Sequence, residues 1–178
     1  MQKSLICIVF LFLLFSCSSK QEHPEKILFV TSNQHTYGNT NINASNHFAE
    51  IVLAYDVFIK NDYVVDFVSP KGGAIPIGYI TTSDSIQKKY LYDNDFMNLL
   101  KNTNSPQEII ASNYNAIYYS GGGSAMFGVA EDIKIQNIAT TIFKNGGIVS
   151  AICHGTAGPR GYRHLWCGQF CRVWGDHV

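Results

Sequence analysis

Residues 147–155 read Gly-Ile-Val-Ser-Ala-Ile-Cys-His-Gly, an apolar run with β-branched residues that ends at a cysteine and a histidine. Such a run predicts a buried strand that stops at a sharp turn before a helix. Ala151 and Gly155 leave the room that a tightly turning backbone needs around Cys153. The first N–H groups of the next helix carry partial positive charge, which favours a thiolate. We therefore interpret Cys153 as a catalytic nucleophile rather than a structural cysteine, and the N–H of His154 as an oxyanion donor.

The segments that precede this stretch alternate between strand and helix patterns. Apolar β-branched runs predict strands, and apolar residues at intervals of three and four predict helices. Residues 74–93 are poorly periodic, and we expect this segment to wrap the surface. The alternation, without an internal repeat, predicts a doubly wound α/β domain with a mostly parallel sheet covered on both faces. We expect strands at 26–32, 63–69 and 115–120, and helices at 48–61, 131–144 and around 96–100.

Composition and charge narrow the class of protein. The chain has 178 residues, of which 46% are hydrophobic and 15% are charged, and its formal net charge is zero. These values suit one α/β domain and give no indication of a nucleic-acid partner. The five cysteines stand in unrelated contexts and do not indicate a disulfide framework. The pair Cys167 and Cys171 resembles metal-ligand spacing only superficially, so we predict no metal site and no cofactor.

Residues 1–19 resemble a targeting segment. Lys3 precedes an uncharged apolar run that is too short for a stable transmembrane helix. The run ends in Leu-Phe-Ser-Cys at residues 14–17, which resembles a bacterial lipobox, so Cys17 would be lipidated after cleavage. Residues 20–25 would then be a tether. An ordinary cleaved signal peptide is the alternative, and either reading predicts a bacterial cell-envelope protein, lipid-anchored or periplasmic.

Three segments taken together resemble the ThiJ/PfpI superfamily. They are Val-Ser-Pro-Lys-Gly-Gly at 68–73, Gly-Gly-Gly-Ser-Ala-Met at 121–126 and Ala-Ile-Cys-His-Gly at 151–155, in that order. The resemblance covers about residues 26–158. It implies the flavodoxin-like fold of class I glutamine amidotransferase-like proteins. The first and third segments look most like the branch of heat-shock-type chaperones and glutathione-independent glyoxalases, which implies a role in stress response.

The same resemblance implies roles for individual residues. Cys153 matches the nucleophile, and His154 matches the histidine that follows it. Glu50 matches the acid on the first helix that hydrogen-bonds the cysteine and tunes its ionisation. Gly122 matches the second oxyanion donor, beside the N–H of His154. One departure is Gly123, which stands where relatives often carry a histidine, and it bears on substrate contacts more than on the cysteine chemistry.

Residues 159–178 differ in composition from the rest of the chain. Residues 1–158 contain ten lysines and no arginine, whereas 159–178 contain three arginines, no lysine and both tryptophans. We interpret this segment as an aberrant or frameshifted tail, after which the last elements of the family fold would be missing. Exposed apolar strand surface and an unoriented His154 would be the consequences, and an inactive chain is one outcome that this interpretation allows.

The predicted function is cofactor-free thiol chemistry on a small reactive carbonyl. The Cys153 thiolate would add to an aldehyde such as methylglyoxal, and His154 would move the proton. A cysteine amidase or peptidase, acting on a small amide, and a non-catalytic holdase chaperone remain open as alternatives. We expect no nucleic-acid partner, a membrane attachment through a lipid anchor, and the homodimer that the family resemblance implies.

Overall fold

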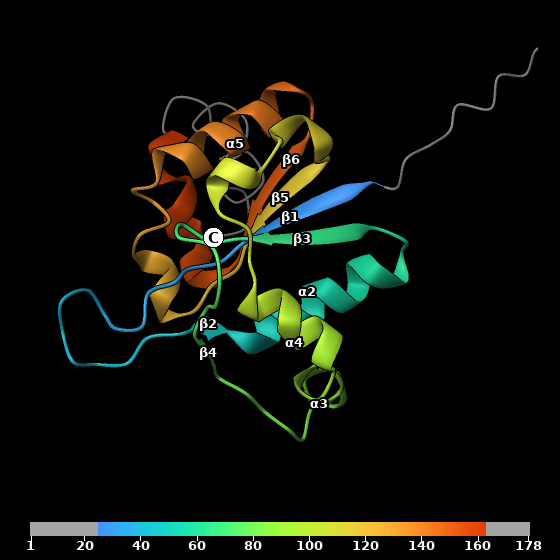
Figure 1. Cartoon of the computed structure of the whole chain (residues 1–178), viewed down its shortest axis with the longest axis vertical. Coiled ribbons are helices and arrows are strands. Elements are labelled where there is room, and N and C mark those ends of the chain that lie inside the picture. The colour runs from blue at the N-terminus through green and yellow to red at the C-terminus, as the bar shows by residue number, and fades with distance from the viewer. Residues whose placement is uncertain (1–24, 163–178) are drawn as a thin grey trace, which may run out of the picture.

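Four parallel strands form the central sheet of the computed structural model, which describes residues 25–162 (Figure 1). The spatial order β3-β1-β5-β6 places the first strand inside the sheet, as crossover connections between parallel strands require. Phe29 of β1 lies opposite Phe67 on one side and Tyr118 on the other. The strands are β1 (Lys26–Val30), β3 (Val64–Val68), β5 (Ala116–Tyr119) and β6 (Ile148–Ala151), at the predicted places.

Helices cover both faces of this sheet, which confirms the predicted doubly wound α/β fold (Figure 1). Side chains alternate between the faces along β1 because successive residues of a strand point to opposite sides. Ile27 and Phe29 belong to the core cluster under α2 and α4, whereas Leu28 and Val30 belong to the cluster under α5. The helices are α2 (Phe48–Lys60), α3 (Ser85–Leu91), α4 (Asn94–Lys101) and α5 (Ile133–Lys144).

The segment 74–93 contains regular structure that the sequence pattern did not predict. β4 (Ile77–Gly78) pairs in parallel with β2 (Asn46–His47), and α3 follows. A strand of two residues is too short to show periodicity. The start of α3 is fixed by Asp84, whose side chain accepts the backbone N–H of Gln87 at 2.8 Å.

β6 is an edge strand in the described part of the chain, with β5 as its single strand neighbour. Only Val149 of its four residues is buried, and Ile148 is 63% exposed. The prediction of a buried strand is wrong for this reason. An apolar run has the same appearance in a central strand and in an edge strand, and the number of neighbours decides its burial.

Short 3-10 helices follow β5, which leads to the glycine turn (residues 121–126), and β6, which leads to Cys153. η4 (Gly123–Met126) follows β5, and η5 (Cys153–Tyr162) follows β6, so the helix expected after Cys153 has 3-10 geometry. Residues 159–162, at the start of the expected tail, continue η5. The other 3-10 helices are η2 (Pro106–Glu108) and η3 (Ala111–Asn113).

Several expectations fall on residues 1–24 and 163–178, outside the described part of the chain. They include the targeting segment, lipidation at Cys17, most of the tether and of the tail, and the pair Cys167 and Cys171. Between residues 25 and 162, no helix is long and apolar enough to cross a membrane.

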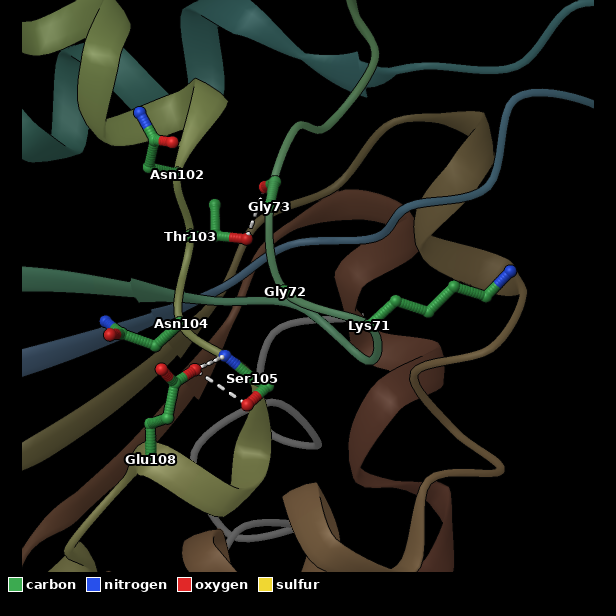
Figure 2. A pocket seen from close by; sticks show the side chains of 8 residues that line it. All are labelled: Lys71, Gly72, Gly73, Asn102, Thr103, Asn104, Ser105 and Glu108. Atoms are coloured by element: carbon green, nitrogen blue, oxygen red, sulfur yellow. Dashed lines mark hydrogen bonds between the residues drawn. The ribbon is translucent and has the colours of Figure 1, made fainter.

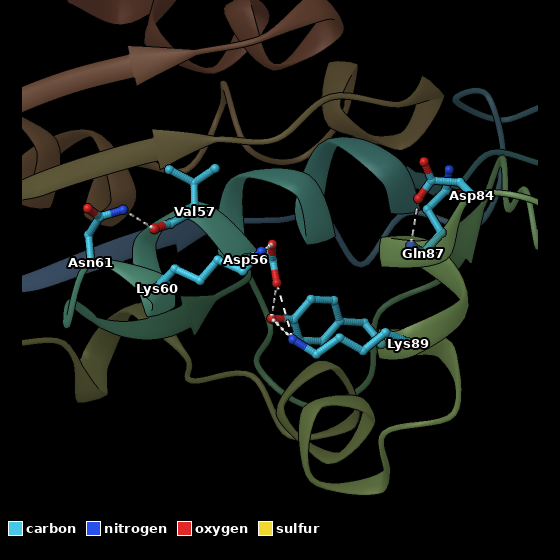
Figure 3. A network of polar contacts seen from close by, with 8 residues as sticks. Asp56, Val57, Lys60, Asn61, Asp84, Gln87 and Lys89 are labelled. Atoms are coloured by element: carbon cyan, nitrogen blue, oxygen red, sulfur yellow. Dashed lines mark hydrogen bonds and ion pairs between the residues drawn. The ribbon is translucent and has the colours of Figure 1, made fainter.

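A charged network joins α2 to α3 (Figure 3). The Asp56 carboxylate is 4% exposed and accepts bonds from Lys89 at 3.2 Å and from the Tyr90 hydroxyl at 2.9 Å. Lys60, one helical turn further along α2, pairs with its second oxygen at 2.6 Å. The bond to Lys60 is the main cause that lowers the pKa of Asp56 to about 2, against the opposing effect of burial.

Asp56→Asn is expected to lower the free energy of unfolding at pH 7 by roughly 2 kcal/mol, because it removes this charge from its two lysines. The folded-state pKa lies below the ordinary value of 3.8, so the contribution is complete above pH 4 and is lost as the pH falls towards 2. Urea unfolding between pH 7 and pH 2 checks this. Glu131→Gln, at an exposed carboxylate, is the control. An Asp56→Asn curve parallel to the wild-type curve down to pH 2 would contradict the prediction.

Candidate active site

Cys153 stands directly beyond the end of β6 in a backbone conformation that cysteine rarely adopts. Its φ is +52°, in the left-handed region, and its side chain is exposed. A non-glycine residue in this region carries strain that the surrounding structure must hold in place. The sequence pattern predicted a sharp turn at this residue, and the strained strand-to-helix geometry is that of a nucleophile elbow.

His154 places a ring nitrogen beside the sulfur of Cys153. The Sγ–Nδ1 distance is 3.6 Å, within hydrogen-bonding range for sulfur. Both side chains are exposed, so a substrate can reach the pair. A thiol next to a ring nitrogen that can accept its proton is the arrangement that activates a cysteine nucleophile.

Glu50 of α2 and Cys153 meet at Gly121, the first residue of the glycine turn. The Glu50 Oε2 atom accepts the Gly121 N–H at 2.9 Å, and the Tyr118 hydroxyl donates to the Glu50 backbone oxygen at 3.0 Å. A Cβ atom added at Gly121 would overlap the Glu50 carboxylate and lie 2.9 Å from the Cys153 Cβ. The Glu50 carboxylate and Cys153 therefore both pack against Gly121. A direct hydrogen bond between Glu50 and Cys153 stays a prediction.

Burial, with the nearby Glu50 charge acting in the same direction, raises the pKa of the Tyr118 hydroxyl far above its ordinary value. Tyr118 is consequently neutral at physiological pH and remains the donor to the Glu50 backbone. This bond fixes the first turn of α2 against β5, and so it fixes where the Glu50 side chain begins.

Two backbone N–H groups near the sulfur have no protein acceptor in the described part of the chain: those of Gly122 and His154. Gly122 has φ +102°, and a Cβ atom there would overlap the backbone of Ser45 and His47. Glycine is required at this position for both reasons. An oxyanion site requires free N–H groups of this kind, and the role of these two amides stays a prediction.

Three aromatic residues also gather at the glycine turn, and sequence reasoning missed all of them: Tyr37, His47 and Tyr79. The rings of His47 and Tyr79 stack at 4.8 Å with an interplanar angle of 5°, and the hydroxyls of Tyr37 and Tyr79 lie 3.5 Å apart. No local motif marks these residues. The only available signal was the lack of a pattern between residues 74 and 93, where Tyr79 stands.

A cavity of about 410 Å³ lies at the opposite edge of the sheet, beyond the end of β3 (Figure 2). Its walls come from the Lys71–Gly73 turn and from residues 102–105 and 108. Thr103 and Gly73 hold the two walls together through reciprocal backbone bonds of 2.8 and 3.1 Å. The last three residues of the Ser-Pro-Lys-Gly-Gly segment therefore line this cavity.

Within residues 25–162, no three histidine, cysteine or acidic side chains lie close enough to hold a metal ion. Cys153 is a free cysteine. The side chains next to its sulfur suit proton transfer and nucleophilic attack.

Comparison with curated proteins identifies several relatives, although no protein-family model matches the chain. The chain is 32% identical over 123 residues to the glutathione-independent glyoxalase hsp3102 of Schizosaccharomyces pombe, covering 64% of this chain and 49% of that protein. It is 28% identical over 141 residues to the glutathione-independent glyoxalase HSP31 of Saccharomyces cerevisiae, covering 75% and 59%. The chain thus spans about half the length of the curated relatives it matches.

Solved structures show the same fold. The Rapid Encystment Protein 24 KDa of Francisella tularensis superposes with a TM-score of 0.70 at 29% identity, covering 75% of this chain and 60% of that one. Glyoxalase III of Candida albicans gives 0.65 at 24% identity, covering 75% and 59%. A ThiJ/PfpI domain protein of Brachyspira murdochii gives 0.52 at 17% identity, covering 77% and 63%, which concerns the fold alone.

These relatives correct the predicted location. The expectation of a bacterial cell-envelope protein is wrong, because the curated relatives are glyoxalases from fungi. The apolar run near the N-terminus suggested that location, and a short apolar run with a following cysteine is a weak signal when no other feature supports it.

Proposed function

The chain belongs to the ThiJ/PfpI superfamily, in its glyoxalase branch, and on this premise we propose that it is a cofactor-free enzyme acting on small reactive carbonyls. The substrate class is that of 2-oxoaldehydes such as methylglyoxal, and the product is a 2-hydroxy acid. The observation that carries the proposal is the strained Cys153 with the His154 ring nitrogen 3.6 Å from its sulfur. The names of the curated relatives favour this chemistry over an amidase, a peptidase or a holdase.

The reaction begins when the Cys153 thiolate attacks the aldehyde carbon. A carbon–sulfur bond forms, the aldehyde oxygen becomes an oxyanion, and protonation gives a hemithioacetal. His154 then removes the proton from the former aldehyde carbon, and a proton is returned to the neighbouring carbonyl carbon. The hydroxyl on the first carbon also gives up its proton as its C=O bond forms, and the oxygen on the second carbon takes up a proton. The first carbon is thereby oxidised to a thioester and the second is reduced to an alcohol. Water cleaves the thioester, so the carbon–sulfur bond breaks and the hydroxy acid leaves with no other reactant consumed.

Other residues of the site would stabilise the charges of these steps. The free N–H groups of Gly122 and His154 suit the oxyanion that forms on the aldehyde oxygen. Glu50 holds the Gly121 N–H and so fixes the turn that carries Gly122. A homodimer, which the family resemblance implies, stays a prediction that analytical ultracentrifugation would check.

His154→Gln is expected to reduce kcat for methylglyoxal by about 10²- to 10⁴-fold, because glutamine cannot move the proton between the two carbons. Formation of the hemithioacetal should persist, so methylglyoxal should still protect Cys153 from iodoacetamide. Lactate measured by NMR without glutathione gives the rate, and wild-type turnover in D2O should place deuterium on the second carbon. His35→Gln, at an exposed loop histidine, is the control. Equal rates for His154→Gln and the wild type would refute the proton-transfer role.

A further inference from the structure

A second group of side chains lies beside the glycine turn, and the proposed reaction does not use them. We call Tyr37, His47 and Tyr79 the aromatic wall. His47 comes from β2, Tyr79 follows β4, and Tyr37 comes from the loop between β1 and β2. The pairing of β2 with β4 brings His47 and Tyr79 together, and their rings stack nearly parallel at 4.8 Å.

Backbone contacts attach the aromatic wall to the glycine turn. The His47 N–H donates to the Gly121 carbonyl at 3.0 Å, and Gly121 is the residue on which Glu50 and Cys153 meet. The Tyr37 hydroxyl occupies the place that a Cβ on Gly123 would take. The aromatic wall therefore lies beside Gly122, whose backbone N–H is free. The glycine at 123, which departs from the family pattern, is what lets Tyr37 approach.

Tyr79 is held in an unfavourable backbone conformation. Its φ is +58°, which is rare for a bulky residue, and its side chain is still 51% exposed. Burial of the ring accordingly does not explain the strain. A strained residue with an accessible side chain next to a nucleophile is the observation from which a functional role can be inferred.

The Tyr79 hydroxyl is protonated and only weakly engaged. The bond with Tyr37 raises the pKa of Tyr79, and burial and the nearby Cys153 sulfur act in the same direction. The phenol is therefore a hydrogen-bond donor at neutral pH. The 3.5 Å distance to the Tyr37 hydroxyl is long for two oxygens, so the proton can turn to a better acceptor.

We propose that Tyr79 is a specificity-determining residue that donates a hydrogen bond to the second oxygen of a 2-oxoaldehyde bound at Cys153. The first oxygen would lie at the Gly122 and His154 N–H groups, and the neighbouring carbonyl oxygen would face the aromatic wall. Tyr79 thereby selects substrates with two vicinal oxygens over simple aldehydes. This inference rests on the proposed function, because it assumes that an aldehyde carbon binds at Cys153.

The test compares two aldehydes in protecting Cys153 from iodoacetamide: methylglyoxal, which has two vicinal oxygens, and propanal, which has one. Alkylation is followed on the Cys153 peptide by mass spectrometry, in the His154→Gln background so that substrate is not consumed. The ratio of the two half-protecting concentrations cancels changes in the intrinsic reactivity of the thiol. Tyr79→Phe keeps the ring stacked on His47 and removes only the hydroxyl. Tyr92→Phe, at a 71% exposed tyrosine that ends α3, is the matched control.

Tyr79→Phe should reduce the preference for methylglyoxal about 10-fold, as expected for the loss of one hydrogen bond, and Tyr92→Phe should leave it unchanged. An unchanged preference in Tyr79→Phe, or no protection by methylglyoxal in any variant, overturns the inference. A different result would contradict the proposed function: wild-type protein would be protected by methylglyoxal but would form no hydroxy acid. In that case the ratio of half-protecting concentrations would still test the binding role of Tyr79.

Discussion

Cys153→Ser is expected to reduce methylglyoxal turnover by at least about 10³-fold, to the limit of detection. A serine hydroxyl is almost wholly protonated near neutral pH and is a much weaker nucleophile than a thiolate, so the carbon–sulfur bond on which every later step depends cannot form. The exchange replaces one exposed atom, so the fold should be unaffected. The measurement is lactate formation by the purified full-length chain without added cofactor.

Ser150→Ala is a suitable control for the Cys153 variant. It removes a hydroxyl from β6, the strand that precedes Cys153, where Ser150 donates to the Ile117 carbonyl at 3.2 Å, and it leaves the cysteine untouched. Wild-type turnover in Ser150→Ala, together with none in Cys153→Ser, would assign the loss to the sulfur. Substantial turnover by Cys153→Ser would show that the reaction proceeds without this nucleophile.

Gly121→Ala is expected to reduce kcat/KM by at least about 10²-fold and to lower the free energy of unfolding by roughly 1–3 kcal/mol. The added methyl group would overlap the Glu50 carboxylate and press on the Cys153 Cβ at 2.9 Å and on the Ile152 oxygen at 3.0 Å. Either Glu50 must leave the Gly121 N–H or the cysteine must shift from its strained position. Urea unfolding and turnover of the same preparation measure both effects.

Two variants separate the local effect of Gly121→Ala from general destabilisation. Gly73→Ala has open space for the methyl group, but its φ of +69° strains alanine, so it should lose stability and keep turnover per folded molecule. Gly121→Ala combined with Glu50→Ala removes the overlap with the carboxylate and should regain part of the lost stability without regaining activity. Wild-type stability and turnover in Gly121→Ala alone would show that Glu50 and Cys153 do not meet at this glycine.

The strands and helices could be predicted where the element is long enough to show a pattern of apolar residues. β1, β5 and α5 lie at the predicted places, because buried strands have continuous apolar runs and α5 repeats its buried residues every three or four positions. β4 could not be predicted, because two residues carry no period. The exposure of Ile148 could not be predicted either, since it depends on how many strands flank β6.

The candidate site also contains residues that a local sequence pattern could suggest and one residue that it could not. Cys153 and His154 could be proposed as site residues from adjacent residues alone, because a turn that exposes a nucleophile requires small residues close to it in the chain. Glu50 was predicted only through a family resemblance, since an acidic residue on a helix has no local feature that distinguishes it. The structure supplies the physical link that the sequence lacked, namely the hydrogen bond from the Gly121 N–H to its carboxylate.

The sequence by itself determined the doubly wound fold, the strained cysteine turn and the adjacent histidine. Each of these depends on residues within a few positions of one another, and hydrophobic periodicity or turn sterics record such local requirements directly. Only the tertiary structure decided that Glu50, the glycine turn and the aromatic wall surround Cys153. Those contacts join segments that parallel strands and the β2–β4 pair bring together from distant parts of the chain, and no local pattern encodes a distance between them.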